Sequence, residues 1–261
     1  MSTTSPTATA DLMNQQLAVP LAEGPTDGHA APARRRLPSG MVTFMFTDIE
    51  GSTRLLQALG EEDYREALDR HHVLLRERIE PNGGVEFGTI GDATFAAFAD
   101  PAAALRACAD VQRAFAAETW PARTRFAIRI GLHRGPAEPR GDDYVAQLAV
   151  HETARIAAAG HGGQVVVSGA VRRATSPERD GLQLVSLGEH MLKDFDDPVE
   201  LHQLAGLGLQ HDFPPLKTPR RQPRHVRLPA TALSGRSAGV IAASRRSPRS
   251  RPAHCCHPPR S

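Results

Sequence analysis

The sequence has few of the features that mark disulfide-rich, membrane-spanning or secreted proteins. Its 261 residues include three cysteines, at positions 108, 255 and 256, which do not make a disulfide framework and fit a reducing compartment. No stretch approaches the roughly 20 apolar residues that a membrane-spanning helix needs. The N-terminus lacks an early basic cluster followed by an apolar run, the pattern of a signal peptide. We therefore expect a soluble, cytoplasmic protein that does not associate with membranes.

Charge is distributed unevenly along the chain. The net charge is only +2, but residues 205–261 contain ten arginines, one lysine and a single acidic residue, Asp212. The central residues 41–204 must therefore carry an excess of negative charge. An acidic central region argues against nucleic acid binding by that region, so any such binding would depend on the basic tail.

Composition divides the chain into three parts. Residues 1–40 are rich in Thr, Ala and Pro and lack a sustained apolar period, which predicts a disordered N-terminal segment. The Arg- and Pro-rich residues 205–261 predict a disordered basic tail. Its "HCCH" at 254–257 lacks the spaced ligand pairs of structural zinc sites, so we favour a solvated tail over a metal site. Residues 41–204 are predicted to form the one folded domain.

Apolar periodicity in residues 41–204 predicts an α+β fold. Helical stripes alternate with short apolar or alternating runs that are typical of strands. Leaving out the last elements, the order is βαββαβ, a ferredoxin-like core to which extra strands are added. The predicted strands are 41–47, 85–87, 94–98, 126–133, 164–167, 182–187 and 199–204, and the predicted helices are 61–80, 101–115 and 145–159.

Two aspartates lie at the ends of predicted strands. Asp48 follows the apolar run "MVTFMF", and Asp92 precedes the apolar run after "GTIG". If the two strands are neighbours, the carboxylates converge and repel each other unless a proton or a cation intervenes. Mg²⁺ prefers such oxygen ligands together with substrate phosphates, and the loop 50–53 opens a helix whose backbone N–H groups suit phosphate. These features predict a metal and triphosphate site, with two ordinary turn aspartates as the alternative.

Five motifs occur in a characteristic order: "FTDIEGST", "GTIGDATFAAF", "IRIGLHRG", "VHETARIAAAGHGGQVVVS" and "LGEHMLKDFDDPVELHQL". Together they resemble the class III adenylate/guanylate cyclase catalytic domain, in the bacterial form found in front of ATPase or regulator regions. The resemblance covers residues 41–204. It implies the class III cyclase fold and the conversion of ATP, or less readily GTP, to a 3′,5′-cyclic nucleotide and pyrophosphate in signal transduction. It also implies a homodimer with sites at the interface, each holding two Mg²⁺ or Mn²⁺ ions.

The resemblance also assigns roles to individual residues. Arg155 matches the arginine that stabilises charge on the phosphate in the transition state. His151 stands where the family usually has an asparagine that holds the ribose. Structural alternatives are a salt bridge of Arg155 with Glu152 and an ordinary surface role for Lys193. The remaining matches are Asp48, Asp92 and the carbonyl of Ile49 for the metals, Gly51, Ser52 and Thr53 for the triphosphate, and Lys193 for the phosphates.

Base recognition departs from the family pattern. Adenylate cyclases of this family usually carry a lysine, and guanylate cyclases a glutamate, at the position that Gly88 occupies here. The second base-reading position falls near residues 144–147 and does not align. Lost hydrogen bonds to the base loosen the choice of purine and misposition the nucleotide. The alternative function is therefore a degenerate cyclase domain that acts as a nucleotide-binding or dimerisation module.

A phosphotransferase of the haloacid-dehalogenase type is a weaker alternative. "DIEGST" loosely echoes its nucleophile loop, but Glu50 stands where that chemistry wants a second aspartate, and the run of parallel βα units is missing. Among the histidines, His133 is interpreted as a structural strand residue. We expect His71, His72 and His161 to be partly solvated.

Overall fold

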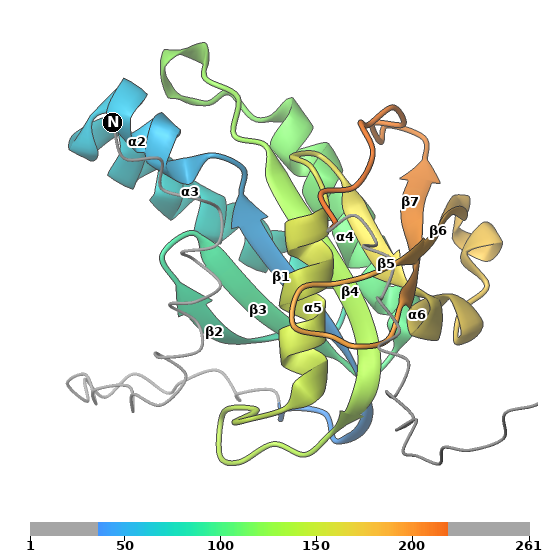
Figure 1. Cartoon of the computed structure of the whole chain (residues 1–261). Coiled ribbons are helices and arrows are strands. Elements are labelled where there is room, and N and C mark those ends of the chain that lie inside the picture. Colours follow the sequence, from blue (N-terminus) through green and yellow to red (C-terminus); the bar gives the residue numbers. More distant parts are fainter. Residues whose placement is uncertain (1–35, 219–261) are drawn as a thin grey trace, which may run out of the picture. The chain divides into compact units, whose positions relative to one another are not determined.

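The computed structural model describes residues 36–218, and seven strands of this part form one mixed sheet (Figure 1). The strand order across the sheet is β2-β3-β1-β4-β5-β7-β6. The strands are β1 (Gly40–Ile49), β2 (Val85–Ile90), β3 (Ala93–Phe98), β4 (Ile128–Ala137), β5 (Val165–Ser168), β6 (Leu182–His190) and β7 (Val199–Gly206). The helices are α2 (Ser52–Leu59), α3 (Glu61–Ile79), α4 (Pro101–Ala117), α5 (Leu148–Ala159) and α6 (Gly169–Arg173), with short 3₁₀ turns η1 (Pro121–Arg123) and η2 (Pro177–Asp180).

The first four strands have the predicted ferredoxin-like arrangement. β1 lies in the middle and pairs antiparallel with both β3 and β4. β2 pairs with β3 at the sheet edge, and β5, β7 and β6 extend the sheet beyond β4. The prediction of an α+β fold with added strands is confirmed.

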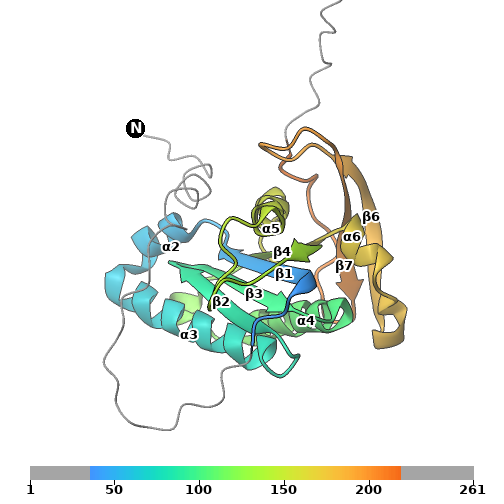
Figure 2. The ribbon, with the colours of Figure 1, turned by 90° about the horizontal axis from the view of Figure 1, so that it is seen from below.

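Helices cover both faces of the sheet. α3 and α4 lie on one face and α5 lies on the other, as Figure 2 shows. Side chains of a strand alternate between faces, so Met45 and Ile49 pack with α3 and α4, whereas Phe44 and Phe46 pack with α5. Both clusters are removed from water, which for each large apolar side chain stabilises the fold by about 1.5–3 kcal/mol.

A glycine in β4 sets the position of α5. A Cβ atom added at Gly131 would lie 2.5 Å from the backbone nitrogen of Ala157 and 2.5 Å from the carbonyl oxygen of Thr153. The missing side chain therefore lets α5 rest directly on β4. This close packing fixes the distance between α5 and the sheet, and with it the positions of the α5 residues His151 and Arg155.

Several boundaries differ from the sequence predictions. The helix predicted from residue 145 begins at Leu148, because Ala146 has a positive φ of 56° and interrupts the preceding turn. Ordered packing continues past the predicted limit at residue 204, through the end of β7 and on to Thr218. On the N-terminal side the fold includes Pro38, whose carbonyl accepts a hydrogen bond from the Tyr144 hydroxyl.

The expectation for His71 was wrong. Its side chain is fully buried on α3, edge-on to the ring of Phe115 at a centroid distance of 5.3 Å. Helical periodicity places it on the same face as Leu74 and Leu75, which face the sheet. His72 and His161 are partly exposed, as expected.

One sequence feature falls outside the described residues, and the apolar character of the helices can be checked within them. The "HCCH" stretch at 254–257 lies beyond the residues that the structure describes. Of the helices between residues 36 and 218, none combines the length and apolar character needed to cross a bilayer.

Candidate active site

Asp48 and Asp92 come together at one end of the sheet. Thr47 of β1 is directly opposite Thr94 of β3, so the next residue of β1 meets the turn before β3. A hydrogen bond joins the two segments, since the Ile49 N–H donates to Asp92 Oδ2 over 3.0 Å. The backbone thus brings Asp48 and Asp92 together, as the sequence predicted for neighbouring strands.

A third charged residue, Arg129, joins this pair from β4. It lies directly opposite Asp48 in the β1–β4 register, and its Nε donates to Asp48 Oδ1 over 2.8 Å. The two side chains are only 12% and 9% exposed. Sequence reasoning missed Arg129, although a basic residue within the alternating apolar strand "FAIRIGLH" was a signal.

Burial and charge shift the pKa values of these groups. Burial raises the pKa of the Asp92 carboxyl, and the negative charge of Asp48 raises it further. Burial alone would lower the pKa of the Arg129 guanidinium, but its hydrogen bond and ion pair with Asp48 raise it overall. The single guanidinium, bonded to Asp48, therefore lies near two carboxylates, an arrangement that attracts a further cation.

The donor set suits a hard divalent ion. Two carboxylates and the Ile49 carbonyl supply only oxygen ligands, which Mg²⁺ and Mn²⁺ prefer. Within residues 36–218 no group of three or more Asp, Glu, His or Cys side chains is arranged to hold a metal ion. The remaining coordination positions would fall to water or to substrate phosphates, as is usual for Mg²⁺.

The loop after Ile49 turns into α2. Gly51 precedes α2 with a left-handed φ of 75°, a conformation that favours glycine, and its carbonyl starts the helix by accepting from the N–H groups of Arg54 and Leu55. Ser52 and Thr53 are the first two residues of α2, where free N–H groups point outward. A hydrogen bond from the Glu50 N–H to the Ala127 carbonyl, over 2.9 Å, holds the start of this loop in place.

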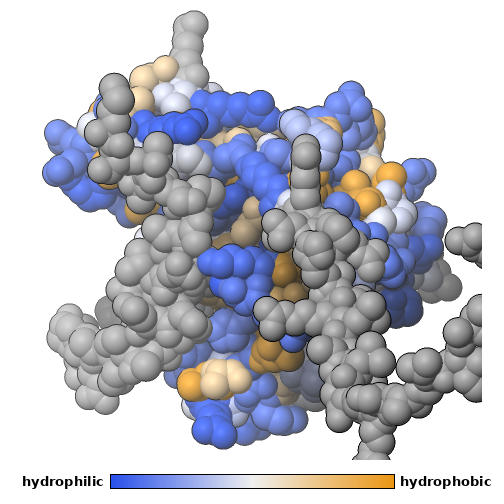
Figure 3. All heavy atoms as spheres, in the orientation of Figure 1, coloured by the Kyte–Doolittle hydropathy of each residue, from blue (hydrophilic) through white to orange (hydrophobic). Residues whose placement is uncertain are grey.

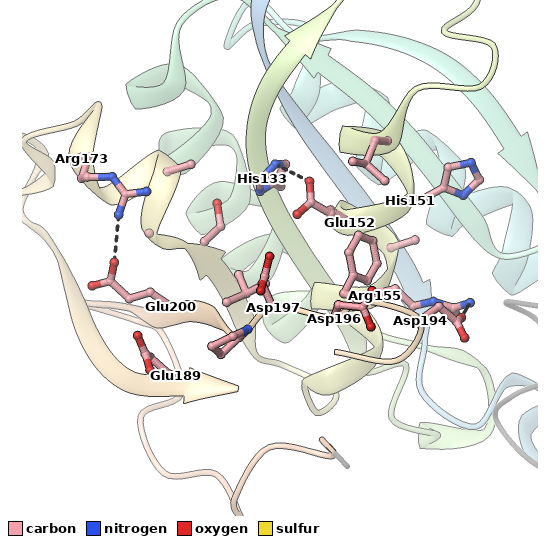
Figure 4. A pocket seen from close by; sticks show the side chains of 18 residues that line it. His133, His151, Glu152, Arg155, Arg173, Glu189, Asp194, Asp196, Asp197 and Glu200 are labelled. Carbon is pink, nitrogen blue, oxygen red and sulfur yellow. Dashed lines mark hydrogen bonds and ion pairs between the residues drawn. The ribbon is translucent and has the colours of Figure 1, made fainter. Parts of the chain in front are cut away.

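His151 and Arg155 line a separate cavity of about 900 Å³ (Figure 4). It lies beside α5 and is closed on the other side by β5, α6, β7 and the loop 194–198. Arg155 pairs with Asp194 of that loop and not with Glu152, so the structural alternative named for Arg155 has a different partner. Glu152 pairs instead with His133 of β4, at 3.0 Å from its Nε2.

The His151 imidazole is neutral at neutral pH. Burial lowers its pKa, and the positive charge of Arg155 lowers it further. The two residues lie four positions apart and share one face of α5, which explains this coupling. A neutral imidazole has one N–H donor and one acceptor nitrogen, so it can replace only part of the hydrogen bonding of an asparagine amide.

The candidate residues fall into two groups within the chain. Neither Asp48 nor Asp92 lines the cavity that contains His151 and Arg155. Lys193 is exposed and is not part of its lining either. The next residue, Asp194, has a positive φ of 69° and directs its carboxylate at Arg155.

Gly88, at the position that the resemblance assigns to base recognition, has no side chain that could contact a base. Gly88 lies at an irregularity of β2, where the pairing with β3 shifts between Glu86 and Gly88. A Cβ atom added there would meet only the Phe95 side chain, at 3.7 Å. Tyr144 is committed to packing, with ring centroids 4.9 Å from those of Phe44 and Phe87.

The surface visible in Figure 3 is mainly hydrophilic, and hydrophobic residues show in small separate groups. Two large apolar side chains are exposed at the start of α5, Val145 at 39% and Leu148 at 67%. Leu148 also lines the cavity with His151 and Arg155.

Comparison with known proteins identifies the family. The model for the adenylate and guanylate cyclase catalytic domain matches residues 36–206. The chain therefore belongs to this family and is an enzyme of the lyase class. The family generally uses divalent metal ions.

Individual relatives agree with this assignment. An uncharacterized protein of Mycobacterium tuberculosis is 35% identical over 208 residues, which cover 78% of this chain and 70% of that protein. A receptor-type adenylate cyclase of Trypanosoma equiperdum is 29% identical over 72% of this chain and 50% of its own length. The structure of an adenylate cyclase from Trypanosoma brucei in its monomeric state has a TM-score of 0.64 at 27% identity, covering 74% of this chain and all of that one.

Proposed function

We propose that this protein is a cytoplasmic purine nucleotide cyclase that converts ATP, and less readily GTP, to the 3′,5′-cyclic nucleotide and pyrophosphate in signal transduction. One observation carries the proposal: buried Asp48 and half-buried Asp92 lie together, with the Ile49 N–H donating to Asp92, beside the loop that opens α2. Adenylate cyclases among the relatives support ATP as the substrate.

Each residue has a definite task in this reaction. Asp48, Asp92 and the carbonyl of Ile49 would hold two divalent ions, Mg²⁺ or Mn²⁺, which when bound favour the 3′-alkoxide and offset the charge of the leaving phosphates. The backbone N–H groups of residues 51–53 bind the triphosphate at the start of α2. Arg129 balances the carboxylates before the metals enter.

The second group of residues acts on the ribose and the reacting phosphate. His151 donates a hydrogen bond to the ribose, and Arg155 stabilises the negative charge that develops on the phosphate in the transition state. Lys193 contributes a further positive charge toward the phosphates. Since the cavity around Arg155 is not lined by Asp48 or Asp92, we propose a homodimer in which each site combines the two groups from different subunits.

Product formation by the full chain tests the activity. The wild type, Asp92→Asn and the control Asp69→Asn, which changes an exposed acid on α3, are incubated with Mn²⁺ or Mg²⁺ and ATP or GTP. We expect cyclic nucleotide from the wild type and the control and none from Asp92→Asn. Equal product from all three would mean that Asp92 is not a metal ligand.

Mixing two inactive variants tests the shared site. Asp92→Asn and Arg155→Ala each lack one half of the site, and a mixed dimer contains one intact site and one with both defects. An equimolar mixture should regain about a quarter of wild-type activity, because half of the dimers are mixed. No recovery in a sample shown to exchange subunits would contradict a site shared between subunits.

A pseudo-cyclase is the second candidate, and two observations favour it. Gly88 offers no side chain to the base, and Arg155 is already paired with Asp194. In that case the protein binds nucleotide in a metal-dependent manner without forming product. Titration with Mn²⁺ and a fluorescent ATP analogue, measured beside the product assay, separates the two functions.

A further inference from the structure

The chain turns back over the domain after β7. In Figure 1 this orange-red segment returns from the end of β7 toward α5. We refer to residues 210–218 as the return segment. The Lys217 N–H donates to the Ala159 carbonyl over 2.8 Å, the Pro215 carbonyl lies 3.0 Å from His161 Nε2, and the Thr218 hydroxyl lies 3.1 Å from His190 Nδ1.

Packing adds to these hydrogen bonds. The side chain of Leu216 packs against a buried cluster formed by α5, β5, β7 and the loop after β6; its members are Ile156, Ala159, Val166, Leu192 and Leu201. The return segment therefore joins the end of α5, which carries His151 and Arg155, to the start of the loop that carries Lys193.

The return segment also contacts Glu50, next to the loop 51–53 that we propose binds the triphosphate, through one ion pair. The Lys217 ammonium bonds to the Glu50 carboxylate, each side chain being 38% exposed. Glu50 also accepts from the Gly162 N–H over 2.9 Å. A Cβ atom at Gly162 would lie 2.8 Å from Glu50 Oε2, so the carboxylate packs directly against this glycine and a larger residue would displace it.

Charge makes this ion pair relevant to the substrate. Glu50 stands between the metal-binding pair Asp48–Ile49 and the loop 51–53, and its negative charge acts on Arg129. Without Lys217, the Glu50 carboxylate would have no ion-pair partner, and one more net negative charge would lie beside Asp48 and Asp92. A triphosphate entering the loop would then meet one more negative charge, which raises the free energy of its binding.

We propose that Lys217 is a positioning residue for the cyclase reaction. By neutralising Glu50 and holding its carboxylate against Gly162, it keeps the loop 51–53 in place for the triphosphate. This inference rests on the proposed function. The return segment then connects three parts of the fold: the loop 51–53, α5, and the loop after β6 that contains Lys193.

The test removes the charge of each partner in turn, and then of both together, in the full-length protein. Lys217→Met keeps the aliphatic stem but leaves Glu50 unpaired, so KM for the metal–nucleotide should rise about 3–10-fold with little change in kcat. Lys217→Arg should restore the wild-type KM. Adding Glu50→Gln to Lys217→Met removes the unpaired charge and should recover most of the loss, a coupling that a double-mutant cycle measures.

A matched control separates this role from general stability. Arg70→Met breaks an ion pair with Glu118 of similar exposure, 43% and 21%, on the α3–α4 side of the fold. It should lower the melting temperature as much as Lys217→Met does and leave KM unchanged. An unchanged KM in Lys217→Met, or a loss of the same size in Lys217→Met with and without Glu50→Gln, overturns the proposal.

The Kd of the metal–nucleotide complex distinguishes failure of the Lys217 proposal from failure of the proposed cyclase function. The Kd of Mn²⁺–ATP is measured by calorimetry for all variants alongside turnover. A wild type that binds but forms no product contradicts the cyclase activity alone, and the Kd ratios then decide the role of Lys217. A wild type that does not bind overturns both.

Discussion

Asp48 and Arg129 face each other across the two central strands β1 and β4, with Arg129 Nε 2.8 Å from Asp48 Oδ1. The pair joins two strands of the sheet through a hydrogen-bonded ion pair. In the proposed function Asp48 is a metal ligand, so the Arg129 guanidinium would compete with the divalent ion for this carboxylate. Experiment can separate the contribution of this pair to stability from its effect on metal binding.

Arg129→Met should destabilise the metal-free protein by about 3–5 kcal/mol, because it leaves the buried carboxylate of Asp48 without its ion-pair partner. Mn²⁺ should raise the melting temperature of this variant by more than it raises that of the wild type, since the ion no longer competes with a guanidinium. Thermal unfolding with and without Mn²⁺ measures both effects. Arg173→Met, which breaks the exposed pair with Glu200, is the control. An equal Mn²⁺ shift in Arg129→Met and the wild type would contradict the competition.

Asp194→Asn should improve nucleotide binding. Asp194 holds Arg155 by an ion pair in which Asp194 is 56% exposed, and a triphosphate must displace this carboxylate. Exposed pairs contribute up to about 1 kcal/mol, so KM should fall by about 2–5-fold. Asparagine tolerates the positive φ at this position, which keeps the loop intact. Asp196→Asn in the same loop is the control, and an unchanged or higher KM in Asp194→Asn would show that the pair does not compete with substrate.

The sequence predicted the parts of the site that depend on strand order. Asp48 and Asp92 each flank an apolar run, and a hairpin next to β1 suffices to bring them together. Arg129 could not be assigned in the same way, because its partner depends on the register of β1 against β4. That register is set by the whole sheet and not by the local pattern.

Long-range packing also explains the other differences. Helical spacing alone does not decide which of two adjacent polar histidines enters the core, whereas the fold buries His71 against Phe115. Arg- and Pro-rich composition predicted disorder from residue 205, yet Leu216 and Lys217 find partners on α5 and at Glu50. Composition cannot anticipate such partners, since they lie more than 50 residues away in sequence.

Burial of His71 should make stability depend on pH. Burial, with a smaller contribution from His72, lowers its pKa from 6.5 to about 3 in the folded protein. As the pH falls from 6.5 toward 3, the unfolded chain binds a proton that the folded protein does not, so the free energy of unfolding decreases. The loss reaches about 1.4 kcal/mol per pH unit for one group, and above pH 6.5 it vanishes. His71→Leu should remove this part of the slope.

Urea unfolding at several pH values below 6.5 measures that slope. His211→Gln changes an exposed histidine of the return segment and should leave the slope unaltered. If His71→Leu and the wild type lose stability in parallel on acidification, the imidazole of His71 is not the group responsible.

Gly88 should accept a base-reading side chain. The nearest atom to a Cβ added there is Phe95 Cδ2 at 3.7 Å, an ordinary van der Waals contact, and its φ is not in the left-handed region. Gly88→Lys and Gly88→Glu should therefore fold normally. A lysine can donate a hydrogen bond to adenine, and a glutamate can accept one from the N–H groups of guanine.

The expected result is a change of purine preference in opposite directions. Gly88→Lys should raise kcat/KM for ATP relative to GTP, and Gly88→Glu should lower it, each by about 10-fold, which corresponds to one well-formed hydrogen bond to a charged group. Gly88→Ala adds a Cβ without a polar group and should keep the wild-type ratio. If both charged variants shift the ratio in the same direction, the side chain at this position does not contact the base, and purine choice in this protein must depend on another part of the site.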